Sequence, residues 1–210
     1  MSTAIIGVGN IGKSVARHLA EGGERVVLAA RHESNARALA NELGELASAS
    51  SVEEAITDAD VVVFAVGFDT LKDLIAQHPD LLRGKVVVDP SNPIAPDNNG
   101  GFVRTLPDGQ SSGSVIAGLL PADAQFVKAF GTLGAESLAS ESNRTPRAVL
   151  FYATDDDQAA GAIERLISAA GFEPVKAGGI DAALRIEAFG GLNGKVVDAN
   201  KARTMVATVA

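Results

Sequence analysis

Three closely spaced glycines, Gly7, Gly9 and Gly12, constrain the fold more than any other feature of this sequence. They lie between a short β-prone run, residues 3–6, and a segment with apolar residues at helical spacing, residues 10–21. A Gly-x-Gly-x-x-Gly turn between a strand and a helix places the free N–H groups and the positive dipole end of the helix where they can hold a pyrophosphate. The pattern therefore predicts a βα unit that binds a dinucleotide.

Each glycine of this turn has a predicted role. Gly7 permits the tight turn that ends the strand, Gly9 lets the backbone approach the diphosphate, and Gly12 lets the helix pack closely against the strand. Because glycine is a common residue, a plain strand-to-helix connection is the alternative. The strand and the helix on either side of the glycines favour nucleotide binding.

The end of the second predicted strand, residues 25–30, indicates which nucleotide is bound. A fold that prefers NAD usually places Asp or Glu directly after this strand, where the carboxylate binds the 2′-hydroxyl of the ribose. This chain has Arg31 and His32 there instead. A guanidinium suits a 2′-phosphate, so the sequence favours NADP, with His32 either at the phosphate or capping the next turn. The alternative is that Arg31 is an ordinary exposed charge and that Glu33 contacts the ribose.

Strand-like and helix-like segments alternate along the chain, which predicts an α/β fold of the doubly wound Rossmann type. The sheet is expected to be mainly parallel, with a small α/β carboxyl-terminal extension. With 210 residues, 46% of them hydrophobic, the chain can bury one substantial core. We expect a single NADP-binding domain over residues 1–210, made of a dinucleotide-binding core at 1–140 and an extension at 141–210 packed on it.

The apolar run at residues 60–66 reads as a buried strand. Ligands of doubly wound sheets lie beyond the carboxyl ends of the strands, so Ala65, Val66, Gly67 and Phe68 are expected at the nicotinamide half of the cofactor. The ring of Phe68 could equally belong to the core.

A second buried strand, residues 85–89, runs into Pro90-Ser91-Asn92-Pro93, which can continue neither as strand nor as helix. At this edge of the sheet, Ser91 and Asn92 are placed to hydrogen-bond a ribose or a carboxamide. A plain turn is the alternative. The glycine- and proline-rich residues 94–113 that follow are predicted to form a loop over the site, with a hairpin around residues 102–106.

Composition and charge exclude several functional classes. The chain has no cysteine, which excludes disulfides, thiol catalysis and cysteine-based metal sites and fits a reducing cytoplasm. A net charge of −8 and a pI near 4.9 argue against nucleic acid as a partner. The sequence shows no signal peptide and no apolar run that approaches a membrane span, so we expect a cytoplasmic protein with no membrane partner.

Several segments together carry a more specific resemblance. They are Gly7-Val8-Gly9-Asn10-Ile11-Gly12, Ala30-Arg31-His32, Asp89-Pro90-Ser91-Asn92-Pro93, Lys128-Ala129-Phe130-Gly131-Thr132-Leu133-Gly134-Ala135-Glu136 and the stretch from Gly178 to Glu187. In this combination the chain resembles the NADP oxidoreductase family typified by NADPH-dependent coenzyme F420 reductases, to which the NADP domains of STEAP metalloreductases look similar. Two departures stand out: Gly131 occupies a position where the family usually carries Asn, and residues 189–195 differ from the apolar terminal helix of the archetypal reductases.

The resemblance implies an NADP(H)-dependent enzyme that transfers a hydride between NADPH and a small-molecule acceptor, a flavin or deazaflavin such as coenzyme F420. The alternative is a non-catalytic NADP(H)-binding redox sensor or regulator. The resemblance also implies a homodimer, for which residues 182–192 are a candidate interface or, equally, part of the internal core. The residues expected at the cofactor are Gly7, Val8, Gly9, Asn10, Ile11, Gly12, Arg31, His32, Ala65, Val66, Gly67, Phe68, Ser91, Asn92, Ala129 and Gly131.

No catalytic acid, base or metal ligand is assigned. Hydride transfer resides in the cofactors, so the absence of a catalytic dyad is no objection. Short-chain dehydrogenases need Tyr with Lys four residues later, whereas Tyr152 is followed at that spacing by Asp156. The acidic run at residues 155–157 reads as the amino-terminal charge of a helix rather than a metal site. The remaining polar candidates read as helix-end, strand-end or surface residues: Asp69, His78, Asp89 and Arg185.

Overall fold

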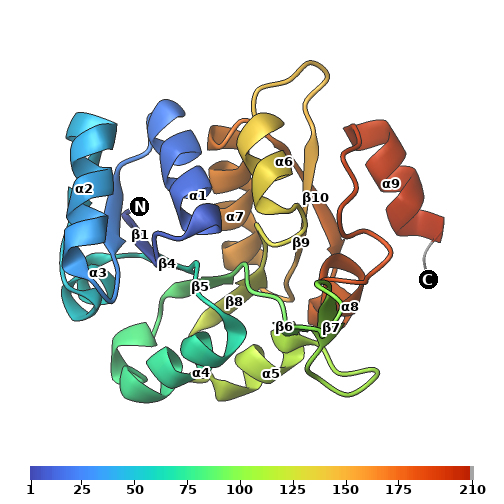
Figure 1. Cartoon of the computed structure of the whole chain (residues 1–210), viewed down its shortest axis with the longest axis horizontal. Helices are drawn as coiled ribbons and strands as arrows, with labels where there is room; N and C mark the ends of the chain where they lie inside the picture. The colour runs from blue at the N-terminus through green and yellow to red at the C-terminus, as the bar shows by residue number, and fades with distance from the viewer. Residues whose placement is uncertain (209–210) are drawn as a thin grey trace.

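The structure, a computed structural model, describes residues 1–208 and contains an eight-stranded sheet with helices on both faces (Figure 1). Its strands are β1 (Thr3–Ile6), β2 (Val26–Ala29), β3 (Ala47–Ala49), β4 (Val61–Phe64), β5 (Val86–Asp89), β8 (Gln125–Lys128), β9 (Val149–Ala153) and β10 (Glu173–Gly178). Their spatial order is β10-β9-β8-β5-β4-β1-β2-β3. The predicted Rossmann-type, mainly parallel fold is confirmed.

The strand order reverses direction at β1, which pairs in parallel with β2 on one side and with β4 on the other. In doubly wound sheets, such a reversal opens a crevice beyond the carboxyl ends of the two central strands. Here those ends are Ile6 and Phe64, which are paired in register. The topology therefore places a ligand crevice directly after the glycine turn and after residue 64.

Helices cover both faces of the sheet. They are α1 (Asn10–Glu21), α2 (Glu33–Leu43), α3 (Val52–Asp58), α4 (Phe68–Gln77), α5 (Ser112–Leu119), α6 (Ala135–Ser140), α7 (Asp157–Ala169), α8 (Ala183–Ile186) and α9 (Ala199–Thr208). Figure 1 shows α1, α2 and α6 on one side of the sheet and α4 and α5 on the other. Buried side chains form one large apolar cluster on each side, and a third, smaller cluster packs α8 and α9 against β9 and β10.

The alternation of side chains along each strand explains the two large clusters. Ile5, Val63 and Val88 lie in the cluster that includes α1 and α7. The residues that alternate with them, such as Ile6 and Val87, lie in the cluster that includes α3, α4 and α5. Because both faces are covered, the central strands β1, β4 and β5 are apolar at every position except Thr3 and Asp89 at two of their ends, as expected of a buried parallel sheet.

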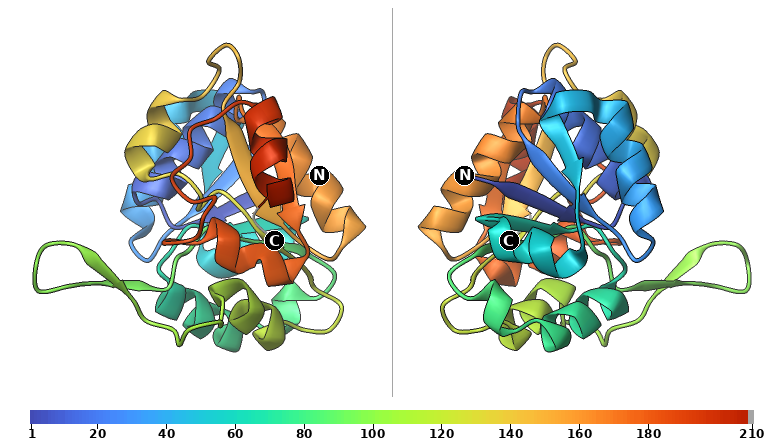
Figure 2. Two further views of the ribbon diagram at one scale, coloured as in Figure 1. Left: turned by 90° about the vertical axis from the view of Figure 1, so that its right-hand side faces the viewer. Right: turned by 90° about the vertical axis from the view of Figure 1, so that its left-hand side faces the viewer.

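Residues 94–104 form a hairpin arm, made of β6 (Ile94–Pro96) and β7 (Phe102–Arg104). A hairpin is present, but the predicted range of 102–106 is wrong for most of it, because only its second strand falls there. Figure 2 shows that the arm projects away from the body of the molecule. The expectation of a loop over the site is wrong for most of this segment, because only Ile94, at the base of the arm, lines the cavity described below.

The carboxyl-terminal part extends the same sheet. Strands β9 and β10 are parallel to each other, and β9 pairs antiparallel with β8 at a single residue pair, Lys128 and Ala153. Residues 182–192, considered above as an interface or as core, bury the side chains of Ala183, Ile186 and Leu192 within the chain. The division into one domain with a core and an extension stays a prediction. No helix among residues 1–208 is long and apolar enough to cross a membrane.

A buried ion pair holds the carboxyl ends of β5 and β8 together. Lys128 Nζ lies 2.7 Å from Asp89 Oδ2, and the two residues are 2% and 0% exposed. The same ammonium group donates to the carbonyl oxygen of Ser91 and, at 2.7 Å, to the hydroxyl of Ser112. Burial of a charge is costly unless it is paired and hydrogen-bonded, and Lys128 meets both conditions. Asp89 and Lys128 belong to two different motifs of the sequence, and neither motif predicted that the two residues would be in contact.

Replacement of Lys128 by Met tests this ion pair. The variant leaves the Asp89 carboxylate buried without its partner, so the free energy of unfolding should fall by about 3–5 kcal/mol. Urea unfolding followed by circular dichroism measures it. Lys176→Met is the control, because Lys176 is exposed on β10 and should change stability by less than about 0.5 kcal/mol. Equal stability of the two variants would contradict the role given to the pair.

Candidate functional site

The glycine turn has the tight geometry expected of it. Gly7 has φ +102°, a conformation that other residues rarely adopt, and its amide donates to the carbonyl of Ala29 at 2.7 Å. A Cβ atom at Gly7 would lie 2.4 Å from the carbonyl oxygen of Ala65. The turn therefore passes directly against the end of β4, and no side chain fits between them.

Gly12 and Gly9 differ in what surrounds them. A Cβ atom at Gly12 would lie 2.0 Å from the carbonyl oxygen of Gly7 and 3.1 Å from the Cβ of Ala65, so this glycine permits the close packing of α1. At Gly9 no heavy atom lies within 4 Å of such a Cβ. Gly9 is also the N-cap residue of α1 and has no side chain that could cap the helix. The first amides of α1 therefore face open space, where an anion can approach.

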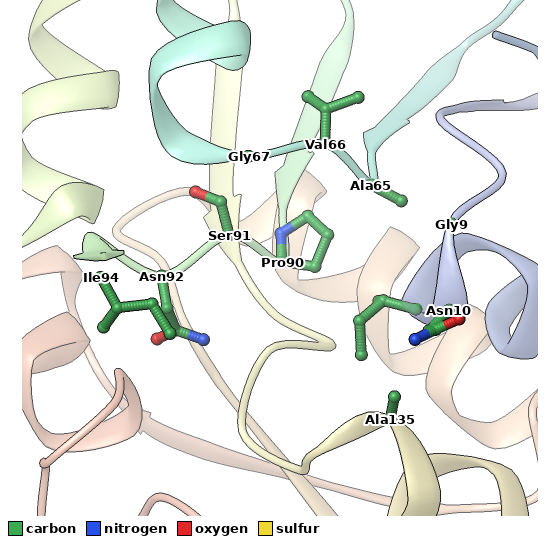
Figure 3. Close-up of a pocket in the computed structure, with 11 residues that line it drawn as sticks. Gly9, Asn10, Ala65, Val66, Gly67, Pro90, Ser91, Asn92, Ile94 and Ala135 are labelled. Atoms are coloured by element: carbon green, nitrogen blue, oxygen red, sulfur yellow. The ribbon is translucent and has the colours of Figure 1, made fainter. Parts of the chain in front are cut away.

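One cavity of about 390 Å³ opens beside the turn, between the ends of β1, β4 and β5 (Figure 3). Its lining residues are Gly9, Asn10, Ile11, Ala65, Val66, Gly67, Pro90, Ser91, Asn92, Ile94 and Ala135. In Figure 3, Asn92 and Ile94 lie at one end of the cavity, and Gly9 and Asn10 at the other. The volume is within the range of small-molecule sites, about 300–1,000 Å³.

A second cavity of about 390 Å³ lies on the other side of the turn. Its lining residues are Gly7, Val8, Gly9, Ala30, Arg31, His32, Asn35, Ala65, Val66, Gly67 and Thr70. Because Gly9, Ala65, Val66 and Gly67 line both cavities, the two adjoin along the carboxyl edge of β1 and β4. Together they form an elongated crevice with the glycine turn at its middle.

Arg31 and His32 are both exposed at the far end of this crevice. His32 is the N-cap residue of α2 but makes no side-chain cap hydrogen bond, so its imidazole does not cap the helix. Glu33, the alternative ribose ligand, forms an ion pair with Arg37 and does not line the cavity. The geometry thus favours Arg31 over Glu33 as the residue that meets a ligand here.

Asn35 and Thr70 also line the second cavity, although neither residue was predicted at the site. Asn35 is the third residue of α2, and Thr70 lies in the first turn of α4. The amino-terminal turns of both helices therefore face the crevice. Both residues lie in the first turn of a helix that follows a central strand, and this position in the sequence could have predicted them as ligand-binding residues.

Four of the residues predicted at the cofactor do not line either cavity: Gly12, Phe68, Ala129 and Gly131. The ring of Phe68 is 7% exposed and packs in the apolar cluster under α4, which favours the core alternative. Ala129 is buried in the opposite cluster. A Cβ atom at Gly131 would lie 2.3 Å from the carbonyl oxygen of Pro90, which explains why this chain has no Asn there.

The side chains of Ser91 and Asn92, two residues of the cavity wall, differ in their contacts. Asn92 Oδ1 accepts from the amide of Ala188 at 2.6 Å, and Asn92 Nδ2 donates to the carbonyl of Gly131 at 3.1 Å. The hydroxyl oxygen of Ser91 is buried and has no hydrogen-bond partner among residues 1–208. Asn193 also donates to the carbonyl of Gly131, at 3.3 Å, so an amide side chain reaches this point from the carboxyl-terminal segment.

Glu187 holds the carboxyl-terminal segment against α5. No role for this residue was predicted from the sequence. Its fully buried carboxylate accepts from the amides of Ser112 and Gly113, at 3.1 and 3.0 Å, and from the hydroxyl of Ser112 at 2.9 Å. Arg104 Nη2 lies 3.6 Å from the same group. The carboxylate therefore occupies the amino terminus of α5 and ties it to both the carboxyl-terminal segment and the base of the arm.

The other polar candidates have structural partners. Asp156 caps α7 by accepting from the amide of Ala159 at 2.7 Å, as predicted for the acidic run. Asp69 pairs with Lys72 at 2.8 Å on the surface of α4. Arg185 lies in the last turn of α8, a helix-end position as predicted, and its partly buried guanidinium donates to the carbonyls of Ala177 and Val206.

Tyr152, the tyrosine excluded above as a catalytic residue, is a core residue of β9. Its side chain is buried, and its hydroxyl donates to Glu164. Burial and this carboxylate raise the pKa of the Tyr152 phenol well above its ordinary value.

Comparisons with known proteins agree with this geometry. The sequence profile of the family described as NADP oxidoreductase, coenzyme F420-dependent, matches residues 2–93. An F420-dependent NADP reductase from Methanothermobacter thermautotrophicus is 26% identical over 197 residues, which cover 89% of this chain and 85% of that protein.

Solved structures of similar shape span almost the whole chain. A hypothetical protein from Sinorhizobium meliloti superposes with a TM-score of 0.84 at 30% identity, covering 94% of this chain and 95% of that one. A protein from Arthrobacter proposed to be an F420-dependent NADP reductase superposes with a TM-score of 0.74 at 23% identity, covering 87% of each chain.

The contrast between Gly9 and Gly12 gives a matched pair of variants. Gly12→Ala places a methyl group 2.0 Å from a carbonyl oxygen, so it should lower the free energy of unfolding by about 1–3 kcal/mol or more. Gly9→Ala meets open space, and φ −71° and ψ −167° suit alanine, so its effect should stay within about 0.5 kcal/mol. Thermal unfolding of both variants measures the difference. If Gly9→Ala were the less stable of the two, the packing described for α1 would be incorrect.

Proposed function

Because this chain belongs to the family of coenzyme F420-dependent NADP oxidoreductases, and is thus an NADP-dependent oxidoreductase, we propose that it transfers a hydride between NADPH and a flavin or deazaflavin. The observation that carries the proposal is the elongated crevice. Its two cavities adjoin at the glycine turn, with Arg31 at one end and Asn92 at the other. A dinucleotide has the same plan, two nucleoside halves joined by a pyrophosphate.

In this proposal the pyrophosphate lies over Gly9. The space beside Gly9 and the uncapped amides of α1 fit an anionic diphosphate, which both the N–H groups and the helix dipole attract. The overall charge of −8 repels an anionic ligand, so binding depends on these local groups.

The adenosine half would occupy the second cavity. Arg31, which is exposed there, would bind the 2′-phosphate through charge-assisted hydrogen bonds. His32 and Asn35 line the same space and would bind the phosphate or the ribose. The selectivity for NADP over NAD would therefore depend mainly on Arg31.

The nicotinamide half would occupy the first cavity, beside residues 65–67 and Asn92. NADPH supplies the hydride from its nicotinamide ring, and the acceptor ring must lie against that ring. The chain contributes orientation and the exclusion of water, because the buried ion pair of Lys128 and the contacts of Asn92 hold this wall in place.

Asn10, whose side chain lies in the cavity, is the polar group best placed at the pyrophosphate side.

The proposed activity is tested by following the oxidation of NADPH at 340 nm with coenzyme F420, FMN and FAD as acceptors. We expect turnover with at least one of these planar acceptors. Tight binding of NADPH without turnover on any of them would overturn the proposal and favour a redox sensor.

Arg31→Ala tests the predicted preference for NADP. Loss of a charged hydrogen-bond partner should raise the Kd for NADPH about 10- to 100-fold, and leave the Kd for NADH nearly unchanged because NADH lacks the 2′-phosphate. Fluorescence titration measures both constants. Arg83→Ala is the control. Arg83 is an exposed arginine shortly before β5, so it lies at the amino ends of the strands, away from the crevice at their carboxyl ends. A parallel loss of NADH binding would contradict the assignment of Arg31.

We also propose that the enzyme is a cytoplasmic homodimer, as the family resemblance and the absence of cysteine indicate. Light scattering coupled to gel filtration should give twice the chain mass of 21.4 kDa. A single species of the monomer mass would contradict the dimer.

A further inference from the structure

Phe189 has a conformation and an exposure that the fold does not explain. Its φ is +72°, in the left-handed region that bulky side chains rarely adopt, and its side chain is 67% exposed. Such a backbone conformation costs free energy, and here no burial of the ring offsets the cost. Strained residues of this kind concentrate at functional sites.

The turn that carries Phe189 is rigidly held. The amide of Gly190 donates to the carbonyl of Glu187 at 2.8 Å, and a Cβ atom at Gly190 would lie 2.3 Å from the carbonyl oxygen of Leu184. Glu187 is itself fixed by the amides at the start of α5. The ring of Phe189 is therefore presented from a fixed point of the backbone.

That point lies at the wall of the first cavity. The amide of Ala188, the residue directly before Phe189, donates to Asn92 Oδ1 at 2.6 Å. Asn92 and Ile94 line the end of the cavity that lies farthest from Gly9 (Figure 3). In the proposed function this is the nicotinamide end, where the acceptor must enter.

The cavity itself supplies no aromatic surface. Among the residues that the structure describes, those that line the cavity are glycine, alanine, valine, isoleucine, proline, serine and asparagine. A flavin or deazaflavin stacked on a nicotinamide has a second, outward face that is flat and apolar. An aromatic side chain at the rim of the site can cover such a face.

We infer that Phe189 is a binding residue for the planar ring of the hydride acceptor. The inference rests on the proposed function and names the part of the chain that binds the second substrate. This role explains why an exposed phenylalanine with a strained backbone directly follows Ala188, which contacts the cavity-lining residue Asn92. It also explains why the turn at Gly190 holds the backbone of Phe189 in place.

Phe189→Ala and Phe189→Asn test the inference with coenzyme F420 and FMN as acceptors. Loss of the stacking ring should raise the acceptor KM about tenfold in both variants. The Kd and KM for NADPH should stay unchanged. Asn tolerates a positive φ, so Phe189→Asn should also raise the Tm by about 2–4 °C. A gain in stability together with a loss of acceptor binding is not expected of a residue with a purely structural role.

Phe102→Ala is the matched control, because Phe102 is 58% exposed on β7 of the arm, does not line the cavity, and should leave the acceptor KM unchanged. Phe189→Tyr should keep the wild-type acceptor KM, since the ring is retained. Turnover by the wild-type protein, with a wild-type acceptor KM in Phe189→Ala, would overturn this inference and leave the proposed function standing. No turnover by the wild-type protein with any acceptor would overturn both.

Discussion

The buried ion pair between Lys128 and Asp89 joins the parts of the chain that build the site. These two charges lie at the carboxyl ends of neighbouring strands, β8 and β5, and the ammonium group also binds the carbonyl of Ser91 and the hydroxyl of Ser112. Ser112 in turn donates to Glu187. A charge in the interior requires partners, so this chain of contacts fixes segments that are far apart in the sequence at one edge of the sheet.

The crevice at that edge is formed largely by backbone and small side chains. Gly7 and Gly12 allow the turn to pass against Ala65, and Gly9 leaves open space at the start of α1. The amide of Asn92 braces the wall through Gly131 and Ala188. Such a site binds by shape, helix dipoles and oriented amides, which suits a reaction whose chemistry resides in the cofactors.

The two halves of the proposed site differ in how they are built. The family profile matches residues 2–93, which contain the glycine turn and the ends of β1, β4 and β5. Glu187, Ala188 and Phe189 lie outside this range. Glu187 binds the start of α5, and the amide of Ala188, directly before Phe189, donates to Asn92 in the wall of the first cavity. In the proposed function, the first half binds the hydride donor, and the carboxyl-terminal segment shapes the side from which the acceptor approaches.

The fold class, the glycine turn and the position of Arg31 could be predicted from the amino-acid sequence alone. These are local properties: apolar periodicity, the conformational freedom of Gly7 and the residue type after the second strand are all encoded within a few neighbouring positions. Three features became visible only in the folded chain: Phe68 packs in the core, Asn92 braces the cavity wall, and Glu187 occupies the start of α5. Glu187 contacts Ser112, and Asn92 contacts Ala188, across long stretches of sequence. Such contacts depend on which strands and helices pack together, and a local sequence pattern does not predict that packing.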